Sequence, residues 1–314
     1  MTRKVITVIG ATGAQGGGLA RAILAEPDAQ FIVRAVTRKA DSAAARALAA
    51  AGAEIAIADL DDAASVQRAM AGAYGAFCVT NFWEHFSPEK ELTQAATLAD
   101  AAAKTGVQHV IWSTLEDTRT LVPPGSGRMP VLMGKYNVPH FDAKGEANRF
   151  FSGKVPVTLL NTSFYWDNLI HFGMGPKKGS DGVLGFTLPM GDKKLPGIAA
   201  EDIGRCALGI FKDGAAIIGK TVGIAGEHLT GAQMAAELAK VLGQQVRYKA
   251  VSPEQFRGFG FPGAEDLGNM FQFKADFEEQ FCAVRPLDLS RRLNPSLQTF
   301  ATFLARNKER IPLG

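Results

Sequence analysis

A glycine-rich turn near the N-terminus most constrains the fold of this 314-residue chain. It follows the apolar run Val5–Ile9 directly, opens an alanine-rich helical pattern, and consists of Gly10, Ala11, Thr12, Gly13, Ala14, Gln15 and Gly16. In such a turn the first glycine lets the chain reverse, the second lets the backbone approach a diphosphate, and the third lets helix and strand pack closely. The N–H groups at the helix start then favour a phosphate. The turn therefore predicts a nucleotide-binding α/β fold, with an ordinary structural turn as the alternative.

The first half of the chain alternates β-rich runs with alanine-rich helical patterns. The predicted strands are Val5–Ile9, Phe31–Thr37, Glu54–Ala58, Ala76–Thr80 and His109–Ser113. The predicted helices are Gln15–Glu26, Ser42–Ala51, Ala63–Ala71 and Pro88–Lys104, with N-caps at Asp62 and Ser87 and terminal glycines at Gly52, Gly72 and Gly106. This alternation predicts a Rossmann-type parallel sheet with helices on both faces.

The alternation of strand and helix patterns ends after residue 120. Leu121–Pro139 is rich in Pro, Gly and Met and longer than an ordinary connection, which predicts a functional flap or an irregular surface loop. Further predicted elements are a helix at Phe141–Phe151, a strand at Val155–Leu160, and helices at Ala200–Lys212, Gly231–Leu242, Pro253–Phe259 and Leu297–Asn307. We expect a Rossmann domain at 1–160 and a smaller substrate or partner lobe at 161–314, with some segments returning to the sheet.

Composition and charge exclude several classes of function. The net charge is only +3, and no strip of basic residues with interleaved aromatics indicates a nucleic-acid surface. Cys78, Cys206 and Cys282 share no close spacing, so neither a disulfide framework nor a metal site is expected. No apolar run reaches the roughly 20 residues that span a bilayer. We therefore expect a cytoplasmic protein that binds no membrane.

The end of the second predicted strand indicates which dinucleotide is bound. Thr37, Arg38 and Lys39 stand about 20 residues beyond the glycines, where an NAD-selecting carboxylate would otherwise lie. The guanidinium of Arg38 matches a 2′-phosphate, so the sequence predicts NADP(H), with a solvated basic turn as the alternative. Asp59, Asp61 and Asp62 follow the third strand, and one of these carboxylates is predicted to face the adenine amino group, whereas the others cap a helix. Asp62 is interpreted as the cap.

The fourth predicted strand ends at Thr80, at the edge of the sheet that a cofactor must cross. The backbone there and the Asn81 side chain are predicted to line the ribose. Phe82 and Trp83 follow, and they either wall the pocket or belong to the core.

A strand-end serine and a His-x-x-x-Lys pair are the candidate catalytic groups. Ser113 ends the fifth strand, and His140 and Lys144 share one face of the next helix. The arrangement resembles the short-chain dehydrogenase/reductase superfamily, in which Tyr-x-x-x-Lys supplies a proton and holds the nicotinamide ribose. A protonated His140 could replace the tyrosine as an acid, or it could pack or line the substrate site. Lys144 is predicted to contact the cofactor, with a solvated helix position as the alternative.

Together these motifs resemble the NmrA-like family of atypical short-chain dehydrogenase/reductases, and within it the NADPH redox sensors. The resemblance rests on residues 10–16, 37–38, 79–84, 140–146, 164–169, 260–264 and 266–270. It implies a bilobal protein, dimeric in some members, whose dimeric state or partner binding responds to NADPH. It also implies cofactor contacts from Gly10–Gln15, Arg38, Asp59, Thr80, Asn81, Phe82, Lys144, Tyr165, Trp166, Asp167 and Asn168. Leu121–Pro139 is longer than expected for those sensors, which places the shared partner surface in question.

Two functions follow from these patterns. A redox sensor or regulator is favoured, because a complete cofactor-binding set stands beside an incomplete proton-donating pair. The alternative is an NADPH-dependent reductase of quinones, enones or other aromatic carbonyl compounds, for which hydride position matters more than a strong acid. Phe82, Trp83, Phe164 and Tyr165 would suit a flat acceptor. A monomer or a homodimer, with or without a protein partner, fits either function, and direct DNA binding has no supporting feature.

Overall fold

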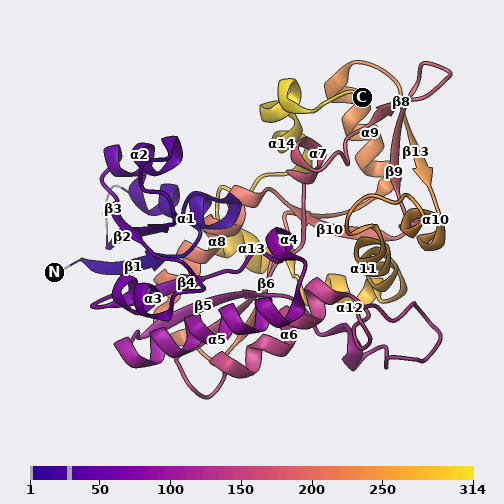
Figure 1. The fold of residues 1–314 in the computed structure, drawn as a ribbon. Coiled ribbons are helices and arrows are strands. Elements are labelled where there is room, and N and C mark those ends of the chain that lie inside the picture. The colour runs from indigo at the N-terminus through magenta and orange to yellow at the C-terminus, as the bar shows by residue number, and fades with distance from the viewer. Residues whose placement is uncertain (1–2, 27–29) are drawn as a thin grey trace.

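A seven-stranded parallel sheet forms the centre of the first lobe in the computed structural model, which describes residues 3–26 and 30–314 (Figure 1). Every neighbouring pair in it is parallel. In spatial order the strands are β11 (Thr221–Gly223), β6 (Val157–Asn161), β5 (His109–Thr114), β4 (Gly75–Cys78), β1 (Lys4–Val8), β2 (Phe31–Thr37) and β3 (Glu54–Ile57). Strand order reverses between β1 and β4, where sheets of this type bind ligands at the carboxyl ends of their strands.

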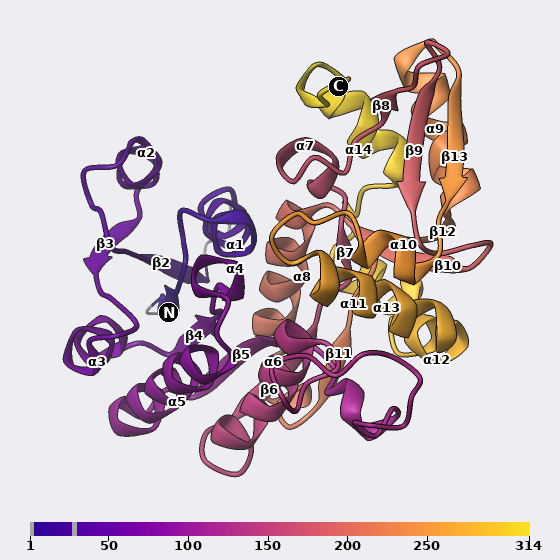
Figure 2. The same cartoon turned by 45° about the vertical axis from the view of Figure 1, so that its right-hand side comes forward.

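Helices cover both faces of this sheet, which confirms the predicted fold class (Figure 2). One face packs against α1 (Ala14–Leu24), α2 (Ala43–Ala50) and α8 (Ala200–Asp213). The other packs against α3 (Ala63–Met70), α5 (Pro88–Thr105) and α6 (Pro139–Phe151). The predicted caps are confirmed: Asp62 accepts the N–H groups of Ala64 and Ser65, and Ser87 accepts that of Lys90. The glycines at 52, 72 and 106 all have positive φ.

Segments beyond residue 160 return to the sheet. Strand β11 extends it next to β6, and α8 lies directly on α1. The two helices approach so closely that a Cβ on Gly204 would stand 2.0 Å from the Leu19 nitrogen, and one on Gly18 would stand 2.6 Å from the Glu201 carbonyl oxygen. This backbone contact joins the second half of the chain to the first and sets the position of the second lobe.

The second lobe contains two small sheets and several helices around a phenylalanine-rich core. One sheet has the order β12 (Glu227–Thr230), β10 (Lys194–Ile198), β7 (Phe164–Tyr165), and the other β13 (Val246–Ala250), β9 (Leu184–Leu188), β8 (Lys177–Lys178). The helices are α7 (Asn168–His171), α9 (Gly231–Leu242), α10 (Pro253–Arg257), α11 (Ala264–Asp276), α12 (Glu278–Ala283), α13 (Leu287–Leu293) and α14 (Phe300–Asn307). Short 3₁₀ turns occur at Thr118–Thr120, Gly214–Ala216 and Lys308–Arg310.

The predicted boundaries differ from the observed ones by a few residues. Helix α10 ends at Arg257 rather than Phe259, and α14 begins at Phe300 because the Thr299 side chain caps it. Helix α4 (Phe82–His85), which follows β4, was not predicted. No helix within the described residues is long and apolar enough to cross a membrane.

The Leu121–Pro139 segment is irregular, as predicted. Before Pro139 begins α6, its one regular pairing is a bridge between Leu132 and Tyr136. The end of the segment is held in place by the buried Asp142, whose carboxylate accepts the backbone N–H groups of Asn137 (2.8 Å) and Val138 (3.0 Å). The segment is therefore anchored at the point where it enters α6.

Candidate functional site

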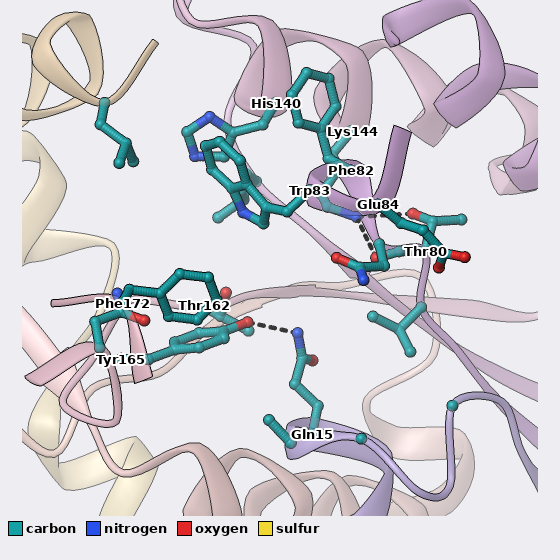
Figure 3. A pocket seen from close by; sticks show the side chains of 18 of the residues that line it. Gln15, Thr80, Phe82, Trp83, Glu84, His140, Lys144, Thr162, Tyr165 and Phe172 are labelled. Carbon is teal, nitrogen blue, oxygen red and sulfur yellow. Dashed lines mark hydrogen bonds between the residues drawn. The ribbon is translucent and has the colours of Figure 1, made fainter. Parts of the chain in front are cut away.

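A cavity of about 1420 Å³ lies at the carboxyl ends of the central strands. Its lining comes from both lobes and extends from the glycine-rich turn to the aromatic residues of α10 and α11. Figure 3 shows this cavity from close by, with Gln15 on one side and His140 and Lys144 on the other. Small-molecule sites usually have volumes of roughly 300–1,000 Å³. The cavity is therefore large enough for more than one ligand.

The glycine-rich turn has the geometry that a diphosphate requires. Gly10 adopts φ +64°, and a Cβ on Gly16 would stand only 2.5 Å from the Gly10 carbonyl oxygen. Gly13 caps α1 without a side-chain hydrogen bond, and the first turn of the helix has no acidic residue. The N–H groups at this end are thus left to a bound anion. Of the predicted turn residues, the buried Ala11 alone does not line the cavity.

Arg38 lies at the rim of the cavity and forms an ion pair with Glu84 of α4. One guanidinium nitrogen is 3.2 Å from Glu84 Oε2, and a second contact joins Arg38 to Oε1 of the same carboxylate. The Arg38 side chain is 59% exposed, and its hydrogen bonds to Glu84 raise its pKa above the usual value. Lys39 and the exposed Asp59 also line this end. The geometry leaves Arg38 accessible to a phosphate that displaces Glu84.

Lys144 is buried against the end of β4. Its Nζ donates to the Thr80 carbonyl oxygen (3.1 Å), the Thr80 hydroxyl (2.8 Å) and Glu91 Oε1 (2.5 Å), as Figure 3 shows for Thr80. These contacts occupy all three donors of the ammonium. Lys144 thereby holds the turn from β4 into α4, which carries Asn81 and Phe82 into the cavity wall.

Glu91, on α5, is the fully buried partner of Lys144. Burial raises the pKa of its carboxyl, but the Lys144 charge and hydrogen bonds from Lys144 and Thr80, together with His85 Nε2 at 3.5 Å, outweigh burial and lower that pKa to about 2. The Glu91 carboxylate is therefore ionised at neutral pH. A lysine held in this way cannot reach a ribose without giving up one of these bonds, so its predicted cofactor contact stays a prediction.

Gln15 links the two lobes across the floor of the cavity. Its side-chain nitrogen donates to the Tyr165 hydroxyl (2.5 Å), as Figure 3 shows. Its oxygen accepts from the Ser113 hydroxyl (2.7 Å). Burial raises the pKa of Tyr165 to about 12, so the phenol is neutral and keeps its proton at physiological pH. Ser113 does not line the cavity itself and reaches it through Gln15. Asn168 completes this part of the lining.

His140 is oriented by a carboxylate from the second lobe. Its Nδ1 lies 2.5 Å from Asp266 Oδ1, and its backbone N–H donates to Oδ2 of the same residue (3.2 Å). The imidazole lies 4.8 Å from the Trp83 ring, and both residues line the cavity. A carboxylate on one ring nitrogen fixes the ring and leaves the other nitrogen for a ligand. The structure thus places His140 and Lys144 on one wall with different partners.

Two residues predicted to contact the cofactor lie elsewhere. Trp166 is buried against Phe300 and Phe303, and it does not line the cavity. The Asp167 carboxylate accepts the N–H of Ala200 (2.8 Å) at the start of α8 and is also absent from the lining. Trp166 therefore belongs to the core of the second lobe rather than to the cavity wall.

Helix α11 supplies residues that the sequence did not predict. Asp266, Met270 and Lys274 follow one another at intervals of four residues, so one face of α11 carries all three toward the same region. Met270 and Lys274 line the cavity. The four-residue spacing was the sequence signal that could have revealed these residues. The sequence contains no comparable signal for Glu91, because an acidic residue in the first turn is common on exposed helices.

The sequence matches the profile of the NmrA-like family over residues 2–304. The chain belongs to this family. A curated relative, the NmrA-like family domain-containing oxidoreductase FrzB of Cladobotryum sp, is 30% identical over 90% of this chain and 87% of its own length. A second, hkm9 of Aspergillus hancockii, is 31% identical over 86% of this chain and 82% of its own length.

Solved structures share this NmrA-like fold. The negative transcriptional regulator NmrA, crystallised in complex with NADP and also with NAD, superposes with a TM-score of 0.78 at 23% identity, over 97% of this chain and 95% of that one. The Citrobacter sp. triphenylmethane reductase complexed with NADP(H) superposes with a TM-score of 0.74 at 20% identity, over 97% and 100% of the two chains.

Proposed function

We propose that this NmrA-like protein is an NADPH-dependent oxidoreductase that reduces a flat, aromatic acceptor. The observation that carries the proposal is the continuity of the cavity. One end has an uncapped helix start and a guanidinium, and the other is walled by aromatic side chains. A site that only binds a regulatory nucleotide does not require the aromatic end of the cavity.

The residues at the first end fit a nicotinamide dinucleotide. Gly16 leaves space that any Cβ would fill, α1 offers its first N–H groups, and Arg38 lines the same end of the cavity. The bound cofactor would supply a hydride to the acceptor. NADP rather than NAD is proposed from Arg38, because its planar fork binds phosphate through two parallel hydrogen bonds.

The second half would bind the acceptor by apolar contact and exclude water from it. Its walls include Phe164, Phe256 and Phe271, which are buried, and Phe259 and Phe261, which are exposed at the rim. Aromatic rings bind flat ligands by stacking or edge contacts. The neutral hydroxyl of Tyr165 is proposed to donate a hydrogen bond to an acceptor oxygen. The free nitrogen of His140 would donate one in the protonated form of the ring, because Nδ1 already donates to Asp266. The oxidoreductase names of both curated relatives support this assignment.

A panel of naphthoquinones, aryl aldehydes and enones tests the proposal. Each compound is incubated with NADPH and protein, and loss of NADPH absorbance is followed. We expect turnover with at least one flat aromatic acceptor. A matched Leu267→Trp variant fills the acceptor half, since Leu267 lines the cavity and is partly buried. It should abolish turnover while keeping NADPH affinity. NADPH binding without turnover across the panel would contradict the proposal.

A sensor function is the second candidate, and the Arg38–Glu84 ion pair favours it. A 2′-phosphate that takes Arg38 would release Glu84 and with it α4, which begins at Phe82. A ligand shifts a conformational equilibrium only by its different affinity for the two states. Small-angle scattering and crosslinking with and without NADPH test this. Identical scattering and crosslinking profiles with and without NADPH would contradict the sensor function but would not bear on the reductase function.

A further inference from the structure

Lys274 is a buried lysine in the acceptor half of the cavity. It lies on α11, is 2% exposed and contributes to the cavity lining. Its ammonium lies 5.3 Å from the ring centre of Phe141, 5.7 Å from Phe271 and 6.0 Å from Phe164, all three of which also line the cavity. The ring centre of Phe281, which does not line the cavity, lies 5.4 Å from the ammonium. The four rings together form an aromatic cage around Lys274. Lysine is rarely buried so completely without a partner.

The ammonium has no anionic partner within the part of the chain that the structure describes. The one hydrogen-bond contact of its Nζ is the Met270 sulfur at 3.3 Å, which is a weak acceptor. The nearby Arg285 is already balanced by Glu116, 2.6 Å away, and donates to the Thr162 carbonyl oxygen. Lys274 is therefore the one charge of this cluster without a counter-ion. A buried charge is costly unless it is paired.

We propose that Lys274 binds an anionic oxygen of the acceptor, and that the acceptor is an aromatic compound that carries a carboxylate or phenolate in addition to the quinone, enone or carbonyl group that takes the hydride. The inference rests on the proposed function, because it names the substrate class of the same cavity. The aromatic cage would hold the ring system, and the ammonium would bind the oxygen by a charge-assisted hydrogen bond. An anionic ligand oxygen at this position would supply the counter-ion that Lys274 lacks.

Imine formation is the other chemistry open to a buried amine. It would join Lys274 Nζ to a carbonyl carbon and release water. Hydride transfer in the same cavity would then reduce the imine to a secondary amine that stays attached to the protein. Such a step ends turnover, so a reversible ion pair is the assignment that suits a reductase.

The charge of Lys274 depends on pH. Burial lowers the pKa of Lys274 to about 7. The Arg285 charge lowers this pKa further by a smaller amount, and the Glu116 charge raises it. On the packed helices, His140 and Asp266 pair with each other, and Arg257 of α10 pairs with Glu254. An anionic ligand needs the ammonium form. Its affinity should therefore be full below pH 7 and fall about tenfold for each pH unit above 7.

Calorimetry with 2-naphthoate and 2-naphthalenemethanol tests the inference on the full-length protein with NADPH present. We expect naphthoate to bind more tightly than the neutral alcohol at pH 6.5. At pH 8, naphthoate binding should take up close to one proton, read from the dependence of the binding enthalpy on the buffer. The alcohol should show no proton uptake.

The Lys274→Met variant keeps the shape and removes the charge. The exposed Lys178, which lies outside the cavity lining, supplies the matched control Lys178→Met. We expect Lys274→Met to lose naphthoate affinity on the order of 10- to 100-fold, with unchanged alcohol affinity, and Lys178→Met to bind like the wild type. Equal loss in both variants, or naphthoate binding without proton uptake at pH 8, overturns the inference while the proposed function stands. Binding of neither probe contradicts the proposed aromatic site itself.

Discussion

Arg38→Ala is expected to weaken NADPH binding and leave NADH binding unchanged. Two charge-assisted hydrogen bonds to a phosphate contribute about 1.5–3 kcal/mol each when fully formed. The Arg38 side chain is 59% exposed, which screens this gain, and the contact with Glu84, worth about 0–1 kcal/mol, must be given up. A net loss of about 1.5–2.5 kcal/mol remains, which corresponds to about 10- to 70-fold in Kd.

Glu84→Gln should have the opposite effect, because it removes the group that competes for Arg38. The expected gain in NADPH affinity is at most about fivefold, the upper limit for an exposed ion pair. Both dinucleotides are titrated by fluorescence at fixed ionic strength, with Arg68→Ala on α3 as a matched control whose side chain is 71% exposed and outside the cavity lining. If Arg38→Ala weakened NADH as much as NADPH, the assignment of the 2′-phosphate to Arg38 would be refuted.

The remaining predictions concern stability. The free energy of unfolding of the wild type should fall by up to about 3 kcal/mol as pH falls from 4.5 to about 2, because Glu91 becomes protonated. Urea denaturation curves of Glu91→Gln should not show this loss. Burial lowers the pKa of His109 to about 4, so wild-type stability should also fall between pH 6.5 and 4 by up to about 3 kcal/mol; an unchanged slope in His109→Gln would disprove this. Gly204→Ala should lower the melting temperature strongly, since its Cβ would stand 2.0 Å from a backbone nitrogen. Gly258→Ala, at φ −74° with ordinary contacts, should change it little; equal effects would contradict the α1–α8 packing.

Periodic sequence patterns predicted the first lobe well, and also several helices of the second half of the chain. Strand Phe31–Thr37 and helix Gly231–Leu242 have the predicted boundaries, because alternating or helical apolar periods coincide there with clear caps. Helix α11 was not predicted. It starts after Gly263 in a left-handed conformation without a side-chain cap, so the usual N-terminal signal is missing. Strands β9 and β13 pair across some sixty residues of chain, and short local patterns cannot reveal such a partner.

The phosphate end of the site was predictable for the same local reason, since Gly10 to Gly16 lie in one turn. The other contacts join distant segments. Lys144 meets Glu91 across two helices, and His140 meets Asp266 of the other lobe. A resemblance placed Trp166 with the cofactor, whereas the structure buries its side chain against Phe300 and Phe303. Neither burial nor side-chain partners follow from spacing alone.

A crystal structure of the NADPH complex is the most direct measurement of the central claim that one cavity holds both a dinucleotide and an acceptor. We expect the diphosphate over the first turn of α1, the 2′-phosphate on Arg38 in place of Glu84, and open space between the nicotinamide and Lys274. A dinucleotide whose nicotinamide fills the aromatic half, with no volume left beside α11, would contradict it.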